Sequence, residues 1–399
     1  MSIDKRTTTI NRFSNIPIDH EEINQSELNI DGKTRSNLFA WNGQFSPQFI
    51  ETLLSYYAKD GFFVVDPFVG SGTVLSECAR KGLRSYGIEL NASAYYMAKT
   101  YEIANLSIEE RTKIITAIDS LLKSIKNEQN IIPSILSYIK KFNNVQRNIL
   151  STLIILMDVF NNEVSFELLN KKWLNLQTII QNIPFSVSRI SVERGDSRHL
   201  GIDDDCADML ITSPPYINVF NYHQKYRRSV EYLGYDVLSI AKSEFGSNRK
   251  NRGNRFLTVI QYCIDMALSI KEAIRVCKPK ARMIYIVGRE SSVLGYSFCN
   301  SELIYNIATQ IFNMELIIRQ ERAFKNRFGQ IIYEDILSFE NPNDIFIEDS
   351  EIIEYGRKIA IDMLFEKYQT STEENKNREL LLDAINKSEN VKPSEVYHE

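Results

Sequence analysis

Cysteine is sparse in this sequence, and paired cysteines are missing. The five cysteines at 78, 206, 263, 277 and 299 form no Cys-x-x-Cys pair, which argues against a disulfide framework and against a zinc cluster. Long apolar runs are also missing, and those present are far too short to span a bilayer. The polar start of the chain has no signal-peptide pattern. These absences indicate a cytoplasmic protein with neither a metal nor a membrane partner.

Charge is distributed unevenly along the chain. The formal net charge is −4, yet residues 217–255 hold eight Lys and Arg against three acids. Residues 340–399 hold fifteen acids against seven bases. A local basic stretch matters more to a phosphate backbone than the global sum does. The alternative is that residues 217–255 are only a solvated loop.

Apolar runs of strand length alternate with segments of helical spacing along most of the chain. Runs that end near Asp66 and Glu89 are each followed by a predicted helix, and Gly82 stops the first of these helices. This alternation predicts an α/β fold with a doubly wound, mostly parallel sheet. The seven expected strands are residues 62–65, 84–88, 187–192, 207–212, 281–287, 316–321 and 334–339.

The alternation is interrupted once, by a stretch rich in Ile, Leu, Asn and Lys. Its helical spacing and its few Gly and Pro residues predict an inserted helical subdomain. The first 36 residues are polar and predict a loosely packed arm, whereas the last sixty predict an acidic helical tail. The expected organisation is an arm (1–36), a cofactor-binding half (37–105), the helical insert (106–185), a catalytic half (186–340) and the tail (341–399).

The segment Asp66-Pro-Phe-Val-Gly-Ser-Gly-Thr73 reads as a cofactor loop between a strand and a helix. Glycine lets a ligand approach the backbone and the helix N-terminus closely. The loop lacks the lysine that a Walker loop uses for phosphates, so a phosphate-free, cationic cofactor suits it better, with Asp66 pairing an ammonium group. Glu89 has the spacing of a ribose-binding acid. The alternative for Gly70 and Gly72 alone is a tight turn.

The segment Ser213-Pro214-Pro215-Tyr216 reads as a catalytic loop. Its two prolines fix φ and remove N–H donors, so the loop presents carbonyl groups in a rigid frame. The Ser213 side chain and the Pro214 carbonyl can accept both hydrogens of an exocyclic amino group, which frees the nitrogen lone pair for attack. Tyr216 offers a face on which an extruded base can stack. The alternative is a polyproline turn.

Together, in this order, the two loops resemble the S-adenosylmethionine-dependent amino-methyltransferases of DNA, in their Ser-Pro-Pro-Tyr form. The resemblance covers residues 37–339 without the insert. It implies the seven-stranded, Rossmann-like sheet of class I methyltransferases, S-adenosyl-L-methionine as cofactor, and direct displacement on a flipped base. The implied catalytic residues are Ser213, Pro214, Pro215 and Tyr216, and the implied cofactor residues are Phe45, Ser46, Pro47, Asp66, Pro67, Phe68, Gly70, Ser71, Gly72, Thr73, Glu89 and Asp196.

Two of these assignments have specific roles in the resemblance. The Phe45-Ser46-Pro47 segment lines the methionine end of the cofactor, although Ser46 and Pro47 also fit the start of a helix. Asp196 is placed at the adenine amino group, although a Gly-Asp pair is also a common turn.

The resemblance implies a site-specific methyltransferase acting on double-stranded DNA at N4 of cytosine, within a restriction–modification system that has a cognate endonuclease. In the family, serine at the first motif position is mostly associated with cytosine, and Asn or Asp with N6 of adenine. Many Ser-Pro-Pro-Tyr enzymes place the catalytic loop before the cofactor loop, and this chain does not. N6-adenine methylation therefore stays an alternative. An RNA amino-methyltransferase and a non-catalytic binding module are further alternatives.

DNA contacts are expected from two regions, the basic stretch and the helical insert. We favour the basic stretch for phosphate contacts, and base reading stays open between the two. Residues 324–330 predict a hairpin tip that either touches the substrate or is a plain turn, and His199 and His223 are expected to be structural or phosphate-facing. The candidate DNA-binding residues are Tyr222, Lys225, Arg227, Arg228, Arg249, Lys250, Arg252 and Arg255.

Overall fold

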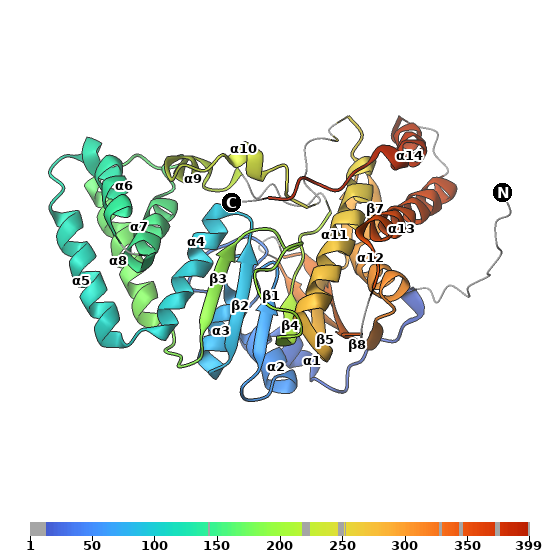
Figure 1. Cartoon of the computed structure of the whole chain (residues 1–399), viewed down its shortest axis with the longest axis horizontal. Helices are drawn as coiled ribbons and strands as arrows, with labels where there is room; N and C mark the ends of the chain where they lie inside the picture. Colours follow the sequence, from blue (N-terminus) through green and yellow to red (C-terminus); the bar gives the residue numbers. More distant parts are fainter. Residues whose placement is uncertain are drawn as a thin grey trace.

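A computed structural model of the chain describes residues 13–142, 144–217, 224–245, 251, 253–326, 329–342, 346–371 and 376–397. Its main sheet consists of β1 (Phe63–Asp66), β2 (Arg84–Glu89), β3 (Ile190–Arg194), β4 (Ala207–Thr212), β5 (Cys277–Gly288), β8 (Glu315–Lys325) and β9 (Ile331–Glu340). The strand order is β3-β2-β1-β4-β5-β9-β8 (Figure 1). Strands β1 to β5 pair in parallel, and β9 is antiparallel to both of its neighbours. The predicted doubly wound, mostly parallel sheet of class I methyltransferases is confirmed.

All seven expected strands are present, and their ends differ from the prediction by a few residues. The differences are largest at β5 and β8, and β5 begins directly after a helix at Cys277 and contains Pro279. A register shift against β4, together with a positive φ of 66° at Lys280, absorbs the proline there. The small hairpin of β6 (Glu290–Val293) and β7 (Tyr296–Cys299) was not expected from the sequence.

Helices cover both faces of the sheet, because its central strands are apolar on both sides. Val65 belongs to the core that includes α11, whereas Val64 belongs to the core that includes α2. The helices of the main domain are α1 (Gln25–Asn29), α2 (Pro47–Tyr57), α3 (Thr73–Lys81), α4 (Ala92–Thr100), α9 (Arg227–Tyr232), α10 (Val237–Ile240), α11 (Phe256–Val276), α12 (Asn300–Asn306), α13 (Asp349–Thr370) and α14 (Lys376–Asn386).

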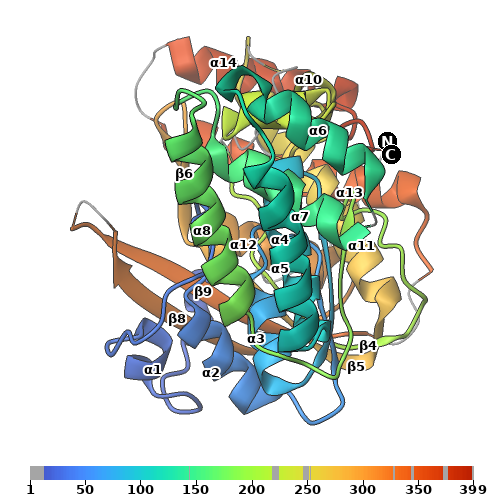
Figure 2. The same cartoon turned by 90° about the vertical axis from the view of Figure 1, so that its left-hand side faces the viewer.

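The interrupting segment is helical, as predicted, and consists of α5 (Ile108–Lys123), α6 (Ile131–Lys141), α7 (Asn144–Met157) and α8 (Phe166–Asn182). Figures 1 and 2 show these helices together at one end of the molecule, beyond strand β3. Helix α7 packs against α4, where the buried hydroxyls of Thr100 and Thr152 lie 3.0 Å apart. The insert thus extends the core past the edge of the sheet.

The insert leaves and rejoins the main domain at a single neck. The backbone N–H of Ser186 donates to the carbonyl of Ala104 over 2.9 Å, so the two chain crossings lie side by side. Arg111 is 2% exposed and holds this neck together. Its guanidinium donates to the backbone carbonyls of Ala104, Leu106, Ile180, Ile183 and Pro184.

The expectation of a loosely packed arm is wrong for the described residues 13–36. Phe13, Ile23 and Leu28 are buried, and the segment lies along edge strand β8. There the Asp19 N–H donates to the carbonyl of Arg319 over 2.7 Å. Few apolar side chains are needed for this packing, which is why the polar composition did not reveal it.

The acidic tail also packs on the main domain. Helix α13 lies along α11, and the segment after α14 runs back over the carboxyl ends of the strands (Figure 1). Ser394 donates from its hydroxyl to the buried Asp265 over 2.7 Å. Among the described residues, no helix is both long enough and apolar enough to cross a membrane.

Candidate active site

Four functional loops meet at one edge of the sheet, because strands β1 to β4 are parallel and all end there. Asp66 ends β1, Glu89 ends β2, Asp196 follows β3, and Ser213 follows β4. Ligands of doubly wound sheets bind at this edge, where the strand order reverses between β1 and β4. The structure brings thirteen of the predicted site residues to one pocket: Phe45, Asp66, Pro67, Phe68, Gly70, Ser71, Thr73, Glu89, Asp196, Ser213, Pro214, Pro215 and Tyr216.

Three predicted cofactor residues do not line this pocket. Ser46 and Pro47 occupy the N-cap and first turn of α2, as a helix start requires. Gly72 has a φ of 94°, and a Cβ there would come within 2.7 Å of the Tyr101 ring. Glycine at position 72 is therefore required for packing between α3 and the chain after α4.

Gly70 and Glu89 form one unit. The N–H of Gly70 donates to Glu89 Oε2 over 2.9 Å, and the N–H of Asn91 donates to Oε1 over 2.8 Å. Burial raises the pKa of Glu89 to about 7. The two backbone bonds fix the carboxylate at the tip of β2, within the pocket lining.

Asp66 links the cofactor loop to the catalytic loop. Its carboxylate is 2% exposed and accepts from the Thr212 hydroxyl at 2.7 Å and from the Phe68 N–H at 3.1 Å. Burial raises the pKa of Asp66 to about 7. A buried carboxylate is stabilised in its ionised form by a nearby cation, so this position suits an ammonium group. Thr212 directly precedes the Ser213 loop, so both loops share this anchor.

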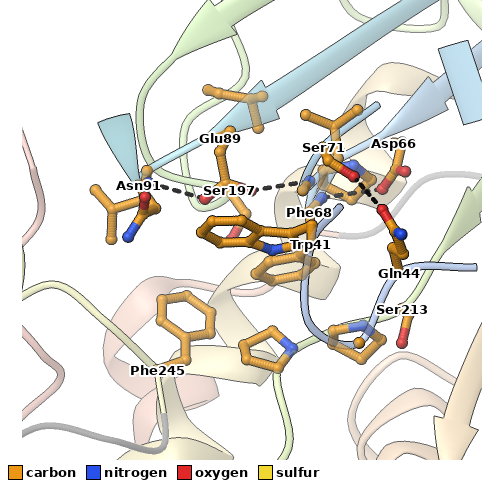
Figure 3. A pocket seen from close by; sticks show the side chains of 18 of the residues that line it. Trp41, Gln44, Asp66, Phe68, Ser71, Glu89, Asn91, Ser197, Ser213 and Phe245 are labelled. Atoms are coloured by element: carbon orange, nitrogen blue, oxygen red, sulfur yellow. Dashed lines mark hydrogen bonds between the residues drawn. The ribbon is translucent and has the colours of Figure 1, made fainter. Parts of the chain in front are cut away.

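The side chains that line the pocket differ in chemistry from one side to the other. Figure 3 shows Asp66, Gln44 and Ser213 at one end and Asn91 and Phe245 at the other, with the ring of Trp41 between them. Including its open mouth, the pocket encloses about 1060 Å³. One polar end and one aromatic end fit a ligand that carries an amino-acid group at one end and an aromatic base at the other.

Asp196 lines the pocket, but its carboxylate is already paired. Arg198 donates to it from two nitrogens, at 2.6 and 2.9 Å, and also reaches Asp265 at 3.0 Å. The same guanidinium donates to the carbonyl of Ser394 in the tail over 2.9 Å. The tail is thereby tied to the Asp196 side of the pocket. A contact between Asp196 and adenine stays a prediction.

Several lining residues were not anticipated. Trp41 and Gln44 lie in the segment that precedes Pro47, so a wider reading of that motif would have included them. Phe245 lies in the basic stretch that we assigned to DNA, and no local pattern marks it. It reaches the pocket because Arg198 lies over its ring, 5.1 Å from the centroid, and Phe68 meets it edge-on at 5.6 Å. The other unanticipated residues are Asn42, Gly43, Val74, Ile88, Leu90, Asn91, Ser197 and Glu244, whereas Val69 lies inside the predicted cofactor loop and Gly195 belongs to the predicted Gly-Asp pair.

The predicted catalytic loop is held in place by contacts with α11 and β5. The hydroxyl of Tyr262 on α11 donates to the carbonyl of Pro215 over 2.8 Å. The Tyr216 ring lies against Gly288 at the end of β5, where a Cβ would come within 2.7 Å of it. Ser213 and Pro214 line the pocket. The loop is thus placed next to the predicted cofactor loop, in the lining of the same pocket.

The candidate DNA-binding residues that the structure describes make separate contacts. Tyr222, Arg249, Lys250 and Arg252 lie outside the described residues, as does His223. Lys225 lies over the ring of Trp41, 4.6 Å from the centroid, and Arg227 pairs with Glu231 at 2.7 Å. Arg228 lies 6.0 Å from the ring centroid of the exposed Phe160 in the insert, and Arg255 is the N-cap of α11. Phosphate contacts by these residues stay a prediction.

In the described part of the chain, no three His, Cys, Asp or Glu side chains are grouped so that they could hold a metal ion.

Comparison with known proteins identifies the part of the chain that contains the cofactor loop. Residues 5–100 match the N6_N4_Mtase family model, described as DNA methylase. The type II methyltransferase M.MjaII of Methanocaldococcus jannaschii is 31% identical over 91 residues, which make up 23% of this chain and 17% of that protein. The match thus spans less than a fifth of the length of this curated relative.

Two solved structures resemble the chain more distantly. A SAM-dependent methyltransferase from Methanosarcina mazei is 11% identical, with a TM-score of 0.35, over 73% of this chain and 98% of that chain. The YcgJ protein from Bacillus subtilis is 7% identical, with a TM-score of 0.34, over 74% of this chain and 98% of that chain. The fold assignment rests on the strand order and not on these two similarities.

The predicted resemblance is confirmed for the segment that holds Phe45, Asp66, Gly70 and Glu89. This family and the class I sheet imply S-adenosylmethionine as the cofactor. Over residues 5–100 the chain is similar to the N6/N4 amino-methyltransferases, the DNA methylases of the matched family model.

Proposed function

We propose that the protein is a site-specific DNA methyltransferase that methylates N4 of cytosine in double-stranded DNA, on a flipped base. The observation that carries this proposal is the shared pocket of Asp66, Glu89 and the Ser213–Tyr216 loop. A role as the modification enzyme of a restriction–modification system, with a cognate endonuclease, belongs to the same proposal. The matched family and the type II methyltransferase relative support it.

The residues of the pocket fit the cofactor that the family implies. Asp66, buried and with a raised pKa, would hold the ammonium group, and Gln44 lies beside it at the same end (Figure 3). Glu89 would hold the ribose hydroxyls, and Phe245 would lie against the base. When bound, S-adenosylmethionine would supply a methyl group on a sulfonium sulfur: the nitrogen lone pair would form the new N–C bond as the carbon–sulfur bond breaks, the sulfur would leave as a thioether, and the nitrogen would release one of its two protons to solvent.

The catalytic loop prepares the target amino group for this transfer. Ser213 and the Pro214 carbonyl accept its two hydrogens, which draws the nitrogen lone pair out of conjugation with the ring. The proline pair keeps these acceptors in place before the substrate arrives, so little reorganisation remains at the moment of reaction. Tyr216 supports the flipped base by stacking.

Affinity for S-adenosylmethionine is expected to fall by about tenfold per pH unit as the pH drops below 7, because Asp66 then takes up a proton and loses its charge. Isothermal titration between pH 6 and 8 measures this slope. Asp66→Asn is the comparison, since the cofactor's own titration is common to both proteins. An unchanged slope in Asp66→Asn would show that another group is responsible.

The free energy of unfolding without cofactor is expected to rise as the pH falls, whereas the affinity for the cofactor falls. Asp66 and Glu89 both have folded-state pKa values raised to about 7, above those of the unfolded chain near 4. The folded state therefore binds more protons than the unfolded chain. The contribution of these two carboxyl groups to the free energy of unfolding is fully present below about pH 4 and is lost as the pH rises through about 7. Urea unfolding at a series of pH values, with and without cofactor, measures both effects.

N6-adenine methylation is the second candidate, because the cofactor loop precedes the catalytic loop in this chain. It would use the same residues in the same roles. RNA is the third candidate substrate class, since an exocyclic amino group in RNA presents the same chemistry.

The test of the function is transfer from labelled S-adenosylmethionine to unmethylated DNA and, separately, to RNA, followed by nucleoside mass spectrometry. N4-methyldeoxycytidine is the expected product. N6-methyldeoxyadenosine would keep the mechanism and change the base, whereas label in RNA alone would overturn the assignment to DNA and to restriction–modification.

A further inference from the structure

A line of four polar side chains runs from the catalytic loop into the antiparallel strands of the sheet. The hydroxyl oxygens of Ser213 and Tyr216 are 3.3 Å apart, and Tyr216 donates to Glu334 Oε1 on β9 over 3.4 Å. The other carboxylate oxygen of Glu334 accepts from Arg322 on β8, at 2.6 Å. Arg322 and Glu334 are direct cross-strand neighbours, 6% and 9% exposed. The line therefore ends in a mostly buried ion pair.

This ion pair fixes the direction of the hydrogen bonds along the line. A carboxylate that is paired with arginine stays ionised and can only accept. The Tyr216 hydroxyl has one proton, which it donates in its hydrogen bond to Glu334. The Tyr216 oxygen can then only accept a hydrogen bond from the Ser213 hydroxyl. Burial and the nearby Glu334 charge raise the pKa of Tyr216, which keeps the phenol protonated and able to donate. The single hydrogen of Ser213 is then directed at the Tyr216 oxygen and is not offered to a ligand.

We propose that Glu334 is a positioning residue that sets Ser213 as a hydrogen-bond acceptor for the amino group of the target base. This inference deepens the proposed function and rests on it. A serine hydroxyl can donate or accept equally well, whereas the target amino group can only be held by an acceptor. With its proton committed to Tyr216, Ser213 presents lone pairs to the pocket. The same arrangement disfavours a base with a carbonyl oxygen at that position, because an acceptor would face an acceptor.

The surroundings of Tyr216 hold the line in place. Its ring is confined by Gly288, which is the β5 residue paired with Glu334 in the sheet. Both oxygen–oxygen separations exceed the 2.7–2.8 Å typical of strong O–H···O bonds. Catalytic hydrogen bonds of this kind commonly shorten when the substrate is bound.

The test is Glu334→Gln. The new side-chain amide keeps the size of the carboxylate but can donate a hydrogen bond to Tyr216, which reverses the direction of the hydrogen bonds from Tyr216 to Ser213. We expect kcat to fall about 10- to 30-fold. The Kd for S-adenosylmethionine and the KM for the polynucleotide should both stay within about threefold of wild type. The matched control is Glu321→Gln, which removes a carboxylate of the same hairpin that pairs with Arg289. Its kcat should be unchanged.

Tyr216→Phe provides a double-mutant cycle, because it keeps the ring and breaks the line at its centre. It should lower kcat by a similar factor, and adding Glu334→Gln to it should lower kcat by less than about twofold. Full additivity of the two losses would overturn the proposal, since Glu334 would then act on the fold and not through Tyr216.

A second readout is the discrimination between base types. In an oligonucleotide whose target base is replaced by its carbonyl-bearing counterpart, wild type should bind more weakly, and Glu334→Gln should narrow that difference. If wild type methylates no polynucleotide, the proposed function fails. If wild type is active and Glu334→Gln behaves like Glu321→Gln, the positioning role alone is overturned.

Discussion

Replacing Tyr216 with alanine is expected to lower the rate of methyl transfer by about 10²- to 10³-fold, with affinity for S-adenosylmethionine nearly intact. Base stacking on an aromatic side chain contributes about 1–3 kcal/mol, and loss of the acceptor for the Ser213 proton adds about 1.5 kcal/mol. Asp66 and Glu89 keep their hydrogen-bond partners in this variant, since none of those bonds involves Tyr216. The loss should therefore fall on kcat.

Single-turnover transfer and calorimetric titration of the cofactor measure the two quantities separately. Tyr355→Ala is a suitable control, because that tyrosine is 49% exposed on α13. It should change neither quantity. Equal losses of transfer and of cofactor binding in Tyr216→Ala would mean that the loop belongs to the cofactor site and that its catalytic assignment is wrong.

Replacing Arg111 with methionine is expected to lower the free energy of unfolding by about 3–5 kcal/mol, an effect typical of breaking a buried charged network. The guanidinium is the donor for five backbone carbonyls at the neck of the insert. Methionine fills much of the same space but donates no hydrogen bond, so several buried carbonyls lose a partner. Because these carbonyls belong to both crossings of the neck, the insert should loosen from the main domain.

The two tryptophans report on the two parts of the molecule during urea unfolding. Trp173 lies in the insert, where its ring N–H donates to Asp119 over 3.1 Å, and Trp41 lies in the pocket. In Arg111→Met, the Trp173 transition should shift to lower urea concentration than the Trp41 transition. Lys113→Met is the control, since its exposed pair with Glu109 contributes at most about 1 kcal/mol. Coincident, unshifted transitions would contradict the role of Arg111.

The sheet, the cofactor loop that begins at Asp66 and the catalytic loop that begins at Ser213 were predictable, because each carries a local sequence signal. An apolar run that ends in Asp66, followed by glycines, marks a strand, its end and a ligand-binding turn within a dozen residues. Once the strands are taken as parallel, their carboxyl ends must share an edge, so Asp66, Glu89 and Ser213 are brought together by topology alone. No distance between them had to be known.

The remaining features depend on contacts that no local pattern encodes. Glu334 reaches Tyr216 across 118 positions only because β9 runs antiparallel to β5 in one particular register. Phe245 enters the pocket because the chain after α10 folds back onto Arg198. The contact between Arg198 and the tail depends on where α13 and α14 pack. Such features follow from tertiary packing, which sequence periodicity does not specify.

The neck at Ala104 and Ser186 makes the helical insert an exchangeable unit. Its two ends are joined by a backbone hydrogen bond, so a different helical segment could be accommodated between them without moving β2 or β3, provided that one of its helices covers α4 as α7 does. Glu89 and Asp196, which follow those strands, would stay in place. A lineage could therefore acquire a new surface beside the pocket by recombination at the neck, and the cofactor chemistry would be inherited unchanged.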